Sequence, residues 1–477
     1  MIVFFRVDSS YKIGAGHLKR CFNLAKIFKG HKIIFISKKF EGNLNHLIPK
    51  SKYSLIEIDP KEKISDIQKV EEIIKKFKQN KIMIVDSYHI DHKWEKKIKY
   101  LVNKLIVIDD IKRNHSADYL INPNWYFNKN NEYFKKYKNC KNLLFGPNYS
   151  LIESVKKKYK NPKDFTIFFG GSDDMGASFK VAKILSNLTS KRINIVLLNK
   201  KKIYIHKFKK EFFNNKKIKI LINLRSIAKI LQRTKIFIGS GGSTTWLRSY
   251  LSVNSIITDL SNDQKDFSIE LHKAKCQSYL KIKHITNPLI LKNTISKVSN
   301  KNKIIKRNFS NLVDGNGLKR IKILLNKKKR NVRIKKMGVQ DSGFVYFLKL
   351  QKKVLNSAFS TKNILLNDHL NWFYKTCLDT KIYFYKICID NVSIGFLRFN
   401  TIKNLSYIDI AIDENFVNFG YASKALNLGI NKLKKKNIKI FIAKVKINNL
   451  ASLNFFKKNK FKFFKSKNNF KELRLTI

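Results

Sequence analysis

Short apolar segments alternate with segments of helical periodicity over the first half of the chain. This alternation limits the possible folds more than any other feature of the sequence. The apolar segments KIIFIS, KIMIVDSY and KLIVIDD occupy residues 32–37, 81–88 and 104–110. A helical pattern lies between them, at residues 64–77. Strands that alternate with helices in this way predict a parallel, doubly wound α/β sheet. Such sheets bind ligands at the carboxyl ends of their strands. The polar residues at these strand ends are Asp86, Tyr88, Asp109 and Asp110.

The first strand and the first helix are joined by a glycine turn that carries a histidine. Residues 2–7 form an apolar, strand-like run, and apolar residues recur at helical spacing after Gly16. Together with Gly14, this glycine allows the backbone to approach a ligand closely, and the helix N-terminus favours a phosphate. His17 stands at this point, with Arg20 about one turn further on, and can act as a general base. The alternative is a histidine that only caps or packs the helix.

Two more strand, glycine-turn and helix units follow. They read DFTIFFGGSDDMGASFKVAKIL at residues 164–185 and KIFIGSGGSTTWLRSYL at residues 235–251, with a further strand-like run at 193–199. Each turn alone could be an ordinary turn. Three turns of the phosphate-binding type in one chain predict an enzyme that holds a nucleotide in a cleft between two Rossmann-like domains.

The formal net charge of +66 raises the question of a nucleic-acid partner. Only 13 of the 99 basic residues are arginine, and the lysines are spread over the whole length. Nucleic-acid-binding proteins favour arginine and cluster their charge. Lys, Asn, Ile and Phe, which are all abundant here, have AT-rich codons. We therefore attribute the charge to genome composition and expect no specific nucleic-acid partner.

The cysteines and the apolar runs indicate the compartment. The chain has 5 cysteines and no close CxxC pair, which predicts a reducing cytoplasm without disulfides and without a metal site. No apolar run approaches the length of a membrane span, and the N-terminus shows no signal-peptide pattern. We expect a cytoplasmic protein without membrane insertion.

The pattern changes near residue 330. The run LNKKKRNVRIKK at residues 325–336 is charged and nearly free of apolar periodicity, so we expect a linker there. After it, strand-like segments joined by short polar turns predict an α+β domain. The expected divisions are a Rossmann-like domain at 1–155, a second, nucleotide-binding Rossmann-like domain at 156–326, a basic linker at 327–336 and the α+β domain at 337–477.

The first 326 residues resemble the UDP-sugar hydrolases of pseudaminic acid biosynthesis. The family pattern of Arg-x-Asp followed by Gly-x-Gly-His-x-x-Arg is matched in order by Arg6, Asp8, Gly14, Gly16, His17 and Arg20. The segments DSY, IDD, GPNYSLI, FFGGSD, GSGGSTTW and DGNGLKRI match as well, at residues 86–88, 108–110, 146–152, 168–173, 239–246 and 314–321. The resemblance implies a fold of the glycosyltransferase B type with UDP in the cleft.

The same resemblance implies roles for particular residues. His17 would activate water for an inverting, metal-free attack at the anomeric carbon. The substrate and UDP would contact the following residues: Arg6, Asp8, Gly14, Gly16, Arg20, Asp86, Tyr88, Gly170, Gly171, Ser172, Gly241, Gly242, Ser243, Thr244, Asp263 and Gln264. Two positions depart from the family. Leu247 replaces a glutamate that can bind the ribose hydroxyls, and Asp263 replaces an asparagine.

Residues from about 332 onward resemble the GNAT-type N-acetyltransferases, and most closely those that act on UDP-4-amino sugars. The segment 354–375 matches a family stretch and includes His369 and Trp372 as implied substrate residues. The acetyl-CoA signature reads VNFGYA at residues 417–422, with Val417 in place of a polar residue. The implied acetyl-CoA residues are Asn418, Phe419, Gly420, Tyr421, Ala422, Asn449 and Phe456. Phe456 replaces the tyrosine that can protonate the leaving thiolate.

Together the resemblances imply a bifunctional enzyme of pseudaminic acid biosynthesis. It would use acetyl-CoA to acetylate the 4-amine of UDP-4-amino-4,6-dideoxy-N-acetyl-β-L-altrosamine, and would then hydrolyse the UDP-2,4-diacetamido sugar. In the alternatives, only one half is active: an acetyltransferase with a UDP-sugar-binding module, or a hydrolase with a degenerate acetyltransferase. A related legionaminic-type sugar as the substrate is another alternative.

Overall fold

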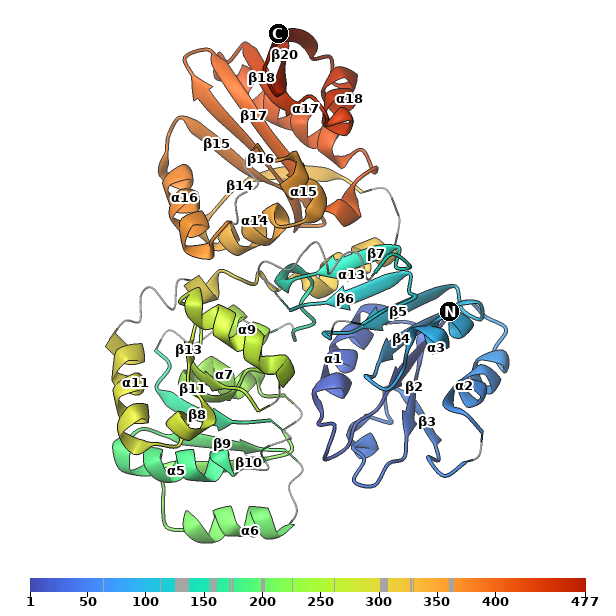
Figure 1. The fold of residues 1–477 in the computed structure, drawn as a ribbon, viewed down its shortest axis with the longest axis vertical. Helices are drawn as coiled ribbons and strands as arrows, with labels where there is room; N and C mark the ends of the chain where they lie inside the picture. The colour runs from blue at the N-terminus through green and yellow to red at the C-terminus, as the bar shows by residue number, and fades with distance from the viewer. Residues whose placement is uncertain are drawn as a thin grey trace. The chain divides into compact units, whose positions relative to one another are not determined.

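The computed structural model describes residues 1–477 except 63, 112, 125–136, 154, 156–160, 171–172, 174–175, 199–201, 225, 261, 301–307, 327, 329 and 360–363. For residues 202, 262, 263 and 300 it describes only the secondary structure. The chain divides into two compact units, Met1–Leu318 and Lys319–Ile477. Figure 1 shows the elements of both units.

The first unit begins with a parallel seven-stranded sheet in the order β3-β2-β1-β4-β5-β6-β7. Its strands are β1 (Ile2–Val7), β2 (Lys32–Lys38), β3 (Ser54–Ile58), β4 (Lys81–Asp86), β5 (Lys104–Ile108), β6 (Tyr119–Asn122) and β7 (Asn142–Phe145). Its helices are α1 (Gly16–Ala25), α2 (Asp66–Lys75) and α3 (His92–Lys99), with short 3₁₀ turns η1 (Lys26–Phe28), η2 (Asn45–Leu47) and η3 (Pro147–Tyr149).

Helices cover both faces of this sheet. Phe5 of β1 stacks on Phe35 of β2, and Phe35 in turn contacts Phe22 of α1. Phe4 points to the opposite face, where it joins a buried cluster with residues of α2 and α3 such as Val70 and Ile98. A strand that is buried on both faces needs a continuous apolar run, and this explains why β1 reads IVFFRV.

A second parallel sheet follows in the same unit, in the order β10-β9-β8-β11-β12-β13. Its strands are β8 (Asp164–Phe168), β9 (Ile193–Leu197), β10 (Ile218–Ile222), β11 (Thr234–Ser240), β12 (Asn254–Thr258) and β13 (Ser278–Tyr279). Its helices are α5 (Ala177–Leu188), α6 (Lys202–Glu211), α7 (Ala228–Arg233), α8 (Thr245–Tyr250), α9 (Asn262–Lys273), α10 (Ile282–Ile285) and α11 (Pro288–Asn300).

Both sheets change direction at one point of their strand order. The chain winds outward from β1 to β3, returns, and continues from β4 on the other side of β1, and β8 and β11 repeat this arrangement. This is the strand order of Rossmann-like domains, in which ligands bind outside the carboxyl ends of the two strands at the switch point. The α/β fold predicted for the first half is therefore confirmed.

The second unit is built on a mixed sheet in the order β14-β15-β16-β17-β18-β20-β19. Its strands are β14 (Val332–Lys336), β15 (Ile382–Ile389), β16 (Val392–Ile402), β17 (Leu405–Ile412), β18 (Ile440–Lys446), β19 (Lys462–Lys467) and β20 (Phe470–Thr476). Its helices are α14 (Ser342–Lys349), α15 (Lys352–Ser357), α16 (Leu366–Leu378), α17 (Tyr421–Lys434) and α18 (Leu450–Lys458), with 3₁₀ turns η4 (Val339–Asp341) and η5 (Glu414–Phe416). α13 (Gly317–Leu325) spans the boundary of the two units.

Helices pack on both faces of this sheet as well. A Cβ on Gly429 of α17 would lie 2.6 Å from Leu397 and 2.7 Å from Phe399, so this helix packs closely on one face of β16. Phe396 points to the other face and joins a buried cluster with residues of α14 and α16, among them Phe373. The β16 side chains of even number therefore face α14 and α16.

The structure differs from the expected linker at residues 327–336. Val332–Lys336 form the edge strand β14, which pairs antiparallel with β15. The side chains of Arg330 and Lys335 bind Asp390 and Asn391 in the turn that follows β15. The alternation of Val332 and Ile334 with basic residues fits a half-exposed strand, but the excess of charge hides this alternation in the sequence.

Candidate active site

The strand order brings the histidine turn to the end of β4. Because β1 and β4 are neighbours, Val7 lies beside Asp86 in the sheet. The turn that leaves β1 therefore returns over Asp86. Gly14 has φ of +84°, a conformation that favours glycine, and α1 begins at Gly16. His17, in the first turn of α1, is thus held above the last residue of β4.

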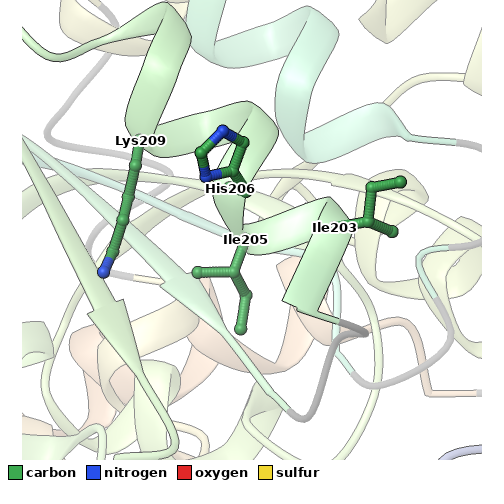
Figure 2. Close-up of a pocket in the computed structure, with 4 residues that line it drawn as sticks. All are labelled: Ile203, Ile205, His206 and Lys209. Carbon is green, nitrogen blue, oxygen red and sulfur yellow. The ribbon is translucent and has the colours of Figure 1, made fainter.

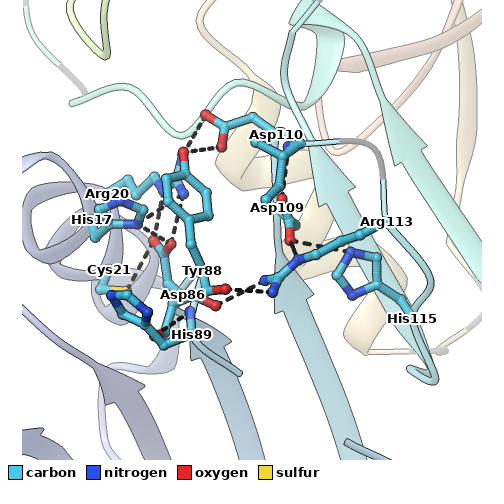
Figure 3. Close-up of polar contacts among 12 residues, drawn as sticks. His17, Arg20, Cys21, Asp86, Tyr88, His89, Asp109, Asp110, Arg113 and His115 are labelled. Atoms are coloured by element: carbon cyan, nitrogen blue, oxygen red, sulfur yellow. Dashed lines mark hydrogen bonds and ion pairs between the residues drawn. The ribbon is translucent and has the colours of Figure 1, made fainter. Parts of the chain in front are cut away.

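His17 and Asp86 form a buried contact (Figure 3). The Nδ1 atom of His17 lies 2.6 Å from Oδ1 of Asp86, whose side chain is fully buried. A carboxylate accepts hydrogen bonds, so Nδ1 donates to Asp86, and in the neutral ring the lone pair is then on Nε2. In the part of the chain that the structure describes, we find no hydrogen-bond partner for Nε2. This is the arrangement of a histidine that accepts a proton at Nε2 while a carboxylate orients its ring.

Arg20 donates hydrogen bonds to both carboxylates of the site, Asp86 and Asp110. It donates to both oxygens of Asp86 at 2.6 Å and to Asp110 at 3.0 Å. Burial alone would raise the pKa of Asp86, but the Arg20 guanidinium and the neighbouring His17 hold it well below its usual range. Burial would also raise the pKa of Asp110, but the Arg20 charge outweighs burial, and the pKa of Asp110 is lowered. Asp86 therefore stays ionised as a partner for His17.

Tyr88 packs against His17. Its ring meets the His17 ring edge to face, with a centroid distance of 4.7 Å. Its hydroxyl donates a short hydrogen bond to Asp110. Burial and the Asp110 charge raise the pKa of Tyr88 far above its usual value. The phenol thus stays protonated and fixed next to the imidazole.

Arg113 is a residue that the sequence did not single out. Its Nη1 donates to the carbonyls of Tyr88 and Ile90 at 2.7 Å, and its Nη2 donates to the carbonyl of Ser87 at 2.8 Å. Its Nε binds Asp109, one of the strand-end aspartates. Arg113 therefore fastens the loop that carries Tyr88 (Figure 3). No local motif marks it, because its partners lie 4 to 26 positions away.

A buried histidine, His115, shares the carboxylate of Asp109 with Arg113. The Nδ1 atom of His115 lies 2.7 Å from Glu95, and its Nε2 lies 3.2 Å from Asp109. Burial lowers the pKa of His115, but the two carboxylates outweigh it and raise the pKa to about 9. The charged imidazole thus belongs to the scaffold of the loop.

Arg6 and Asp8 have partners inside the first sheet. Arg6 is 1% exposed and lies 2.6 Å from both Asp8 and Asp66. Asp8 also accepts a hydrogen bond from the backbone N–H of Lys38 at 2.8 Å. The contacts that the structure gives these two residues therefore join β1, β2 and α2, and their role in binding a substrate remains a prediction.

The predicted UDP residues lie at the switch point of the second sheet. Gly170 follows β8 with φ of +83°, and the Gly241–Thr244 turn follows β11. A Cβ on Gly241 would lie 2.1 Å from Oγ of Ser268, so a larger residue there would require the Ser268 side chain or the turn to shift. Within the first unit, a Cβ on Gly16 would lie 3.5 Å from Oγ of Ser243, so the two glycine turns meet.

Some of the predicted residues are only partly described. Gln264 lies in α9, and its amide nitrogen would be 3.6 Å from a Cβ on Gly242. Gly171, Ser172 and the side chain of Asp263 lie outside the described residues. Leu247, at the position of the family's glutamate, is 8% exposed in α8 and has an apolar side chain.

The predicted acetyl-CoA loop precedes α17. Asn418 and Gly420 both have positive φ, +67° and +73°, and Gly420 is the N-cap of the helix. The rings of Phe419 and Tyr421 stack with a centroid distance of 5.5 Å. Ala422 follows in the first turn of α17, where backbone N–H groups have no partner within the helix. Such a turn suits a pyrophosphate.

Two other predicted acetyl-CoA residues have structural partners. The side chain of Asn449 caps α18 by accepting from the N–H of Ser452 at 3.1 Å. Phe456 is 5% exposed and packs on Phe455 and Phe461. Phe456 thus contributes to the core of the second unit.

The two predicted substrate residues of this unit differ in environment. His369 is 2% exposed, and its Nε2 lies 3.0 Å from the carbonyl of Ser342. Its ring is 5.4 Å from that of Trp372, which is only partly buried. Burial and the charge of Lys349 lower the pKa of His369 to about 3. His369 is therefore neutral and lies beside Trp372, in the aromatic core of the second unit.

Three further findings concern a surface cavity, metal ligands and membrane helices. A surface cavity of about 420 Å³ is lined by Ile203, Ile205, His206 and Lys209, all on α6 (Figure 2). The described residues contain no group of three or more His, Cys, Asp or Glu that could hold a metal ion. The helices among them include none that is long and apolar enough to cross a membrane.

Comparison with known proteins identifies the first half. The chain is 30% identical over 256 residues to the UDP-2,4-diacetamido-2,4,6-trideoxy-β-L-altropyranose hydrolase of Campylobacter jejuni, and the match covers 51% of this chain and 86% of that protein. The chain belongs to this hydrolase family. It is also 29% identical over 269 residues to the uncharacterized protein MJ1062 of Methanocaldococcus jannaschii, which covers 52% of this chain but only 54% of that relative.

The second half matches another family. Residues 350–461 match the acetyltransferase (GNAT) family, so this member of the hydrolase family carries a GNAT domain at its C-terminal end. Among solved structures, the C. jejuni N-acetyltransferase PseH is similar with 16% identity and a TM-score of 0.25, over 30% of this chain and 97% of that one. The two resemblances predicted from the sequence are thus confirmed at the level of the families.

Proposed function

We propose that the chain is a bifunctional enzyme of pseudaminic acid biosynthesis. Its GNAT domain transfers the acetyl group of acetyl-CoA to the 4-amine of UDP-4-amino-4,6-dideoxy-N-acetyl-β-L-altrosamine. Its N-terminal unit hydrolyses the resulting UDP-2,4-diacetamido sugar to the free sugar and UDP. The observation that carries the proposal is the buried contact between His17 and Asp86 in a chain of this hydrolase family.

The geometry of His17 supports a general-base role in the proposed hydrolytic step. Nε2 accepts a proton from water as the water oxygen attacks the anomeric carbon, and the bond from that carbon to the UDP oxygen breaks. UDP leaves with the electron pair, and the anomeric centre is inverted. Asp86, held ionised by Arg20, stabilises the imidazolium that forms. General-base catalysis of this kind contributes roughly 10²- to 10⁴-fold.

The UDP moiety would bind at the second glycine turn. The Gly241–Thr244 turn and Gly170 lie at the carboxyl ends of β11 and β8, where backbone N–H groups can approach a diphosphate closely. The contact of Gly16 with Ser243 supports an arrangement of the glycosyltransferase B type, with the sugar next to His17. Fixed N–H donors there would stabilise the departing diphosphate.

Acetyl-CoA would bind where two strands of the GNAT domain part. β17 and β18 pair only from Leu405 to Ile408, although β17 continues to Ile412. The last residues of β17 are therefore not paired with β18 and can bind an extended ligand, while the loop before α17 receives the pyrophosphate. The amine nitrogen attacks the thioester carbonyl, and the carbon–sulfur bond breaks. The attacking amine loses a proton to water and, because Phe456 cannot donate one, water delivers a proton to the CoA thiolate.

A reaction followed with the whole chain tests both halves. The UDP-4-amino sugar is incubated with and without acetyl-CoA, and the products are followed by mass spectrometry and phosphorus NMR. The expected result is UDP and free diacetamido sugar only with acetyl-CoA, and loss of UDP release in His17→Ala. If the acetylated UDP-sugar accumulates instead, the N-terminal unit is a UDP-sugar-binding module, a candidate that the apolar Leu247 favours.

A further inference from the structure

Two cations of the GNAT domain lie against one tryptophan. The Nζ atom of Lys349, at the end of α14, is 3.5 Å from the ring centroid of Trp372 in α16. The Cζ atom of Arg398, on β16, is 5.1 Å from the same ring. Both distances are within the range of cation–π contacts. We call Lys349, Trp372, Arg398, Asn400 and Asp409 the cation–aromatic cluster.

The cluster lies on the α14 and α16 side of the sheet. Arg398 and Asn400 are two residues apart on β16, so they share a face with Phe396. Asp409 of β17 stands opposite Arg398 in the register, and its carboxylate accepts from Arg398 Nη2 at 2.9 Å. Asp409 is also the first β17 residue after the last pair with β18. The cluster thus borders the point where the two strands part.

The cluster has buried polar atoms without partners. Nε of Arg398 and Oδ1 of Asn400 are both buried and make no hydrogen bond among the described residues. An unpaired buried polar group destabilises a fold, so native structures rarely contain one without a ligand or water. Two such atoms lie on one face of β16: Nε of Arg398 can donate to an anionic ligand, and Oδ1 of Asn400 can accept from a hydroxyl or a water.

The charges of the cluster indicate the kind of ligand. Among the described ion pairs, Lys349 and Arg398 have one carboxylate partner between them: Asp409, which pairs with Arg398. Burial and the charge of Arg398 lower the pKa of Lys349 to about 8, even though Asp409 acts against this shift. The position is therefore short of negative charge, and an anion with several oxygens would satisfy it.

We propose that the cation–aromatic cluster binds the diphosphate of the nucleotide-sugar acceptor, with Lys349 and Arg398 as its ligands. This inference rests on the proposed acetyltransferase function and assigns the anchor of its acceptor. Arg398 Nε and Lys349 Nζ donate to phosphate oxygens, and Trp372 forms the apolar wall beside them. The sugar amine then extends past Asp409 toward the gap between β17 and β18.

Acetyl-transfer kinetics of the whole chain test the proposal. In Lys349→Met and Arg398→Gln, the KM for the UDP-amino sugar should rise roughly 10- to 100-fold, because charge-assisted hydrogen bonds are lost. The KM for acetyl-CoA should stay within about twofold, and the rate with a UDP-free amino sugar should equal that of the unmodified chain. Lys349→Arg should recover part of the loss. Lys375→Met, on the exposed face of α16, is the matched control.

A binding measurement separates this inference from the proposed function. Calorimetry with UDP should give two sites per chain for the unmodified protein, and one site for the double variant of Lys349→Met and Arg398→Gln. The same stoichiometry in both proteins would overturn the inference, as would equal losses with the UDP-free acceptor. Failure of the unmodified chain to acetylate any UDP-amino sugar would overturn the proposed function instead, while the UDP stoichiometry would still decide the role of the cluster.

Discussion

The imidazole of His17 and the carboxylate of Asp86 are 69 positions apart in the sequence and 2.6 Å apart in the structure. Two neighbouring parallel strands bring them together, because one residue follows β1 and the other ends β4. The same carboxylate also accepts two hydrogen bonds from Arg20. Asp86 is thus the common partner of the base and of the cation beside it.

Replacing Asp86 with asparagine should disable His17 and leave the nucleotide site intact. The amide of Asp86→Asn carries no charge to stabilise the imidazolium and can present an N–H to Nδ1, which favours the wrong tautomer. We expect kcat of UDP release to fall roughly 10²- to 10⁴-fold, with a much smaller change in KM. Asp59→Asn, an exposed site in the same domain, is the control for the loss of charge. An unchanged kcat in a folded Asp86→Asn protein would exclude Asp86 as the residue that orients His17 and stabilises the imidazolium.

Arg113 should act on the reaction through the position of Tyr88. Arg113→Ala removes three hydrogen bonds to the carbonyls of the 87–90 loop, so we expect the free energy of unfolding to fall by about 1–3 kcal/mol. We also expect kcat to fall more than KM rises, because the ring beside His17 is no longer fixed. Arg113→Lys keeps the charge but not the planar fork, and should recover only part of both. Full recovery of both by Arg113→Lys would show that the charge alone matters and that the fork of hydrogen bonds does not.

His115 should make the stability of the N-terminal unit fall with rising pH. Its pKa in the folded protein is about 9, above the ordinary value near 6.5, so the folded state binds the proton more tightly. The stabilisation is complete below pH 6.5 and is lost as the pH rises through 9, by roughly 3 kcal/mol in total. Urea unfolding between pH 6 and pH 10, compared with His115→Gln, measures this slope. A parallel slope in the variant would assign the effect to other groups.

Two adjacent glycines offer a matched test of the UDP turn. A Cβ on Gly241 would lie 2.1 Å from Ser268 Oγ, whereas a Cβ on Gly242 would meet only the amide of Gln264, at 3.6 Å. Gly241→Ala should therefore displace Ser268 or the turn and weaken UDP binding roughly tenfold, whereas Gly242→Ala should keep most of the affinity. Calorimetry with UDP compares the two. Similar affinities of both variants would show that the turn does not bind the nucleotide.

Sequence patterns predicted the parts of the fold in which each element is determined locally. The continuous apolar runs of β1, β4 and β5 and the glycine turns after β1, β8 and β11 predicted two parallel sheets. The pairing of His17 with Asp86 was not predicted, since it depends on the strand order, which local patterns do not contain. The role of Arg113 depends on carbonyl groups, which every residue has, so no side-chain motif could indicate it.

Other differences arise from burial and charge. The basic run around Val332 contains a strand whose apolar residues are outnumbered by lysine and arginine. The burial of His369 beside Trp372 was not predicted, because it depends on how α14 and α16 pack, and a contact of His369 with the substrate stays a prediction. Of the cation–aromatic cluster only Trp372 was singled out, because Lys349 and Arg398 belong to separate elements and resemble the many other basic residues of this chain.

The strand β14 determines where the acetyltransferase domain can be cut from the chain. A fragment of residues 337–477 would lack β14 and would leave the hydrogen-bonding edge of β15 open to other chains, a common cause of aggregation. It would also lack Arg320, which is fully buried, donates to the carbonyl of Ser393 at 3.0 Å and lies over the ring of Phe344. A fragment that begins before α13 keeps both features and should be the soluble one, so the basic run belongs to the domain that it was expected only to connect.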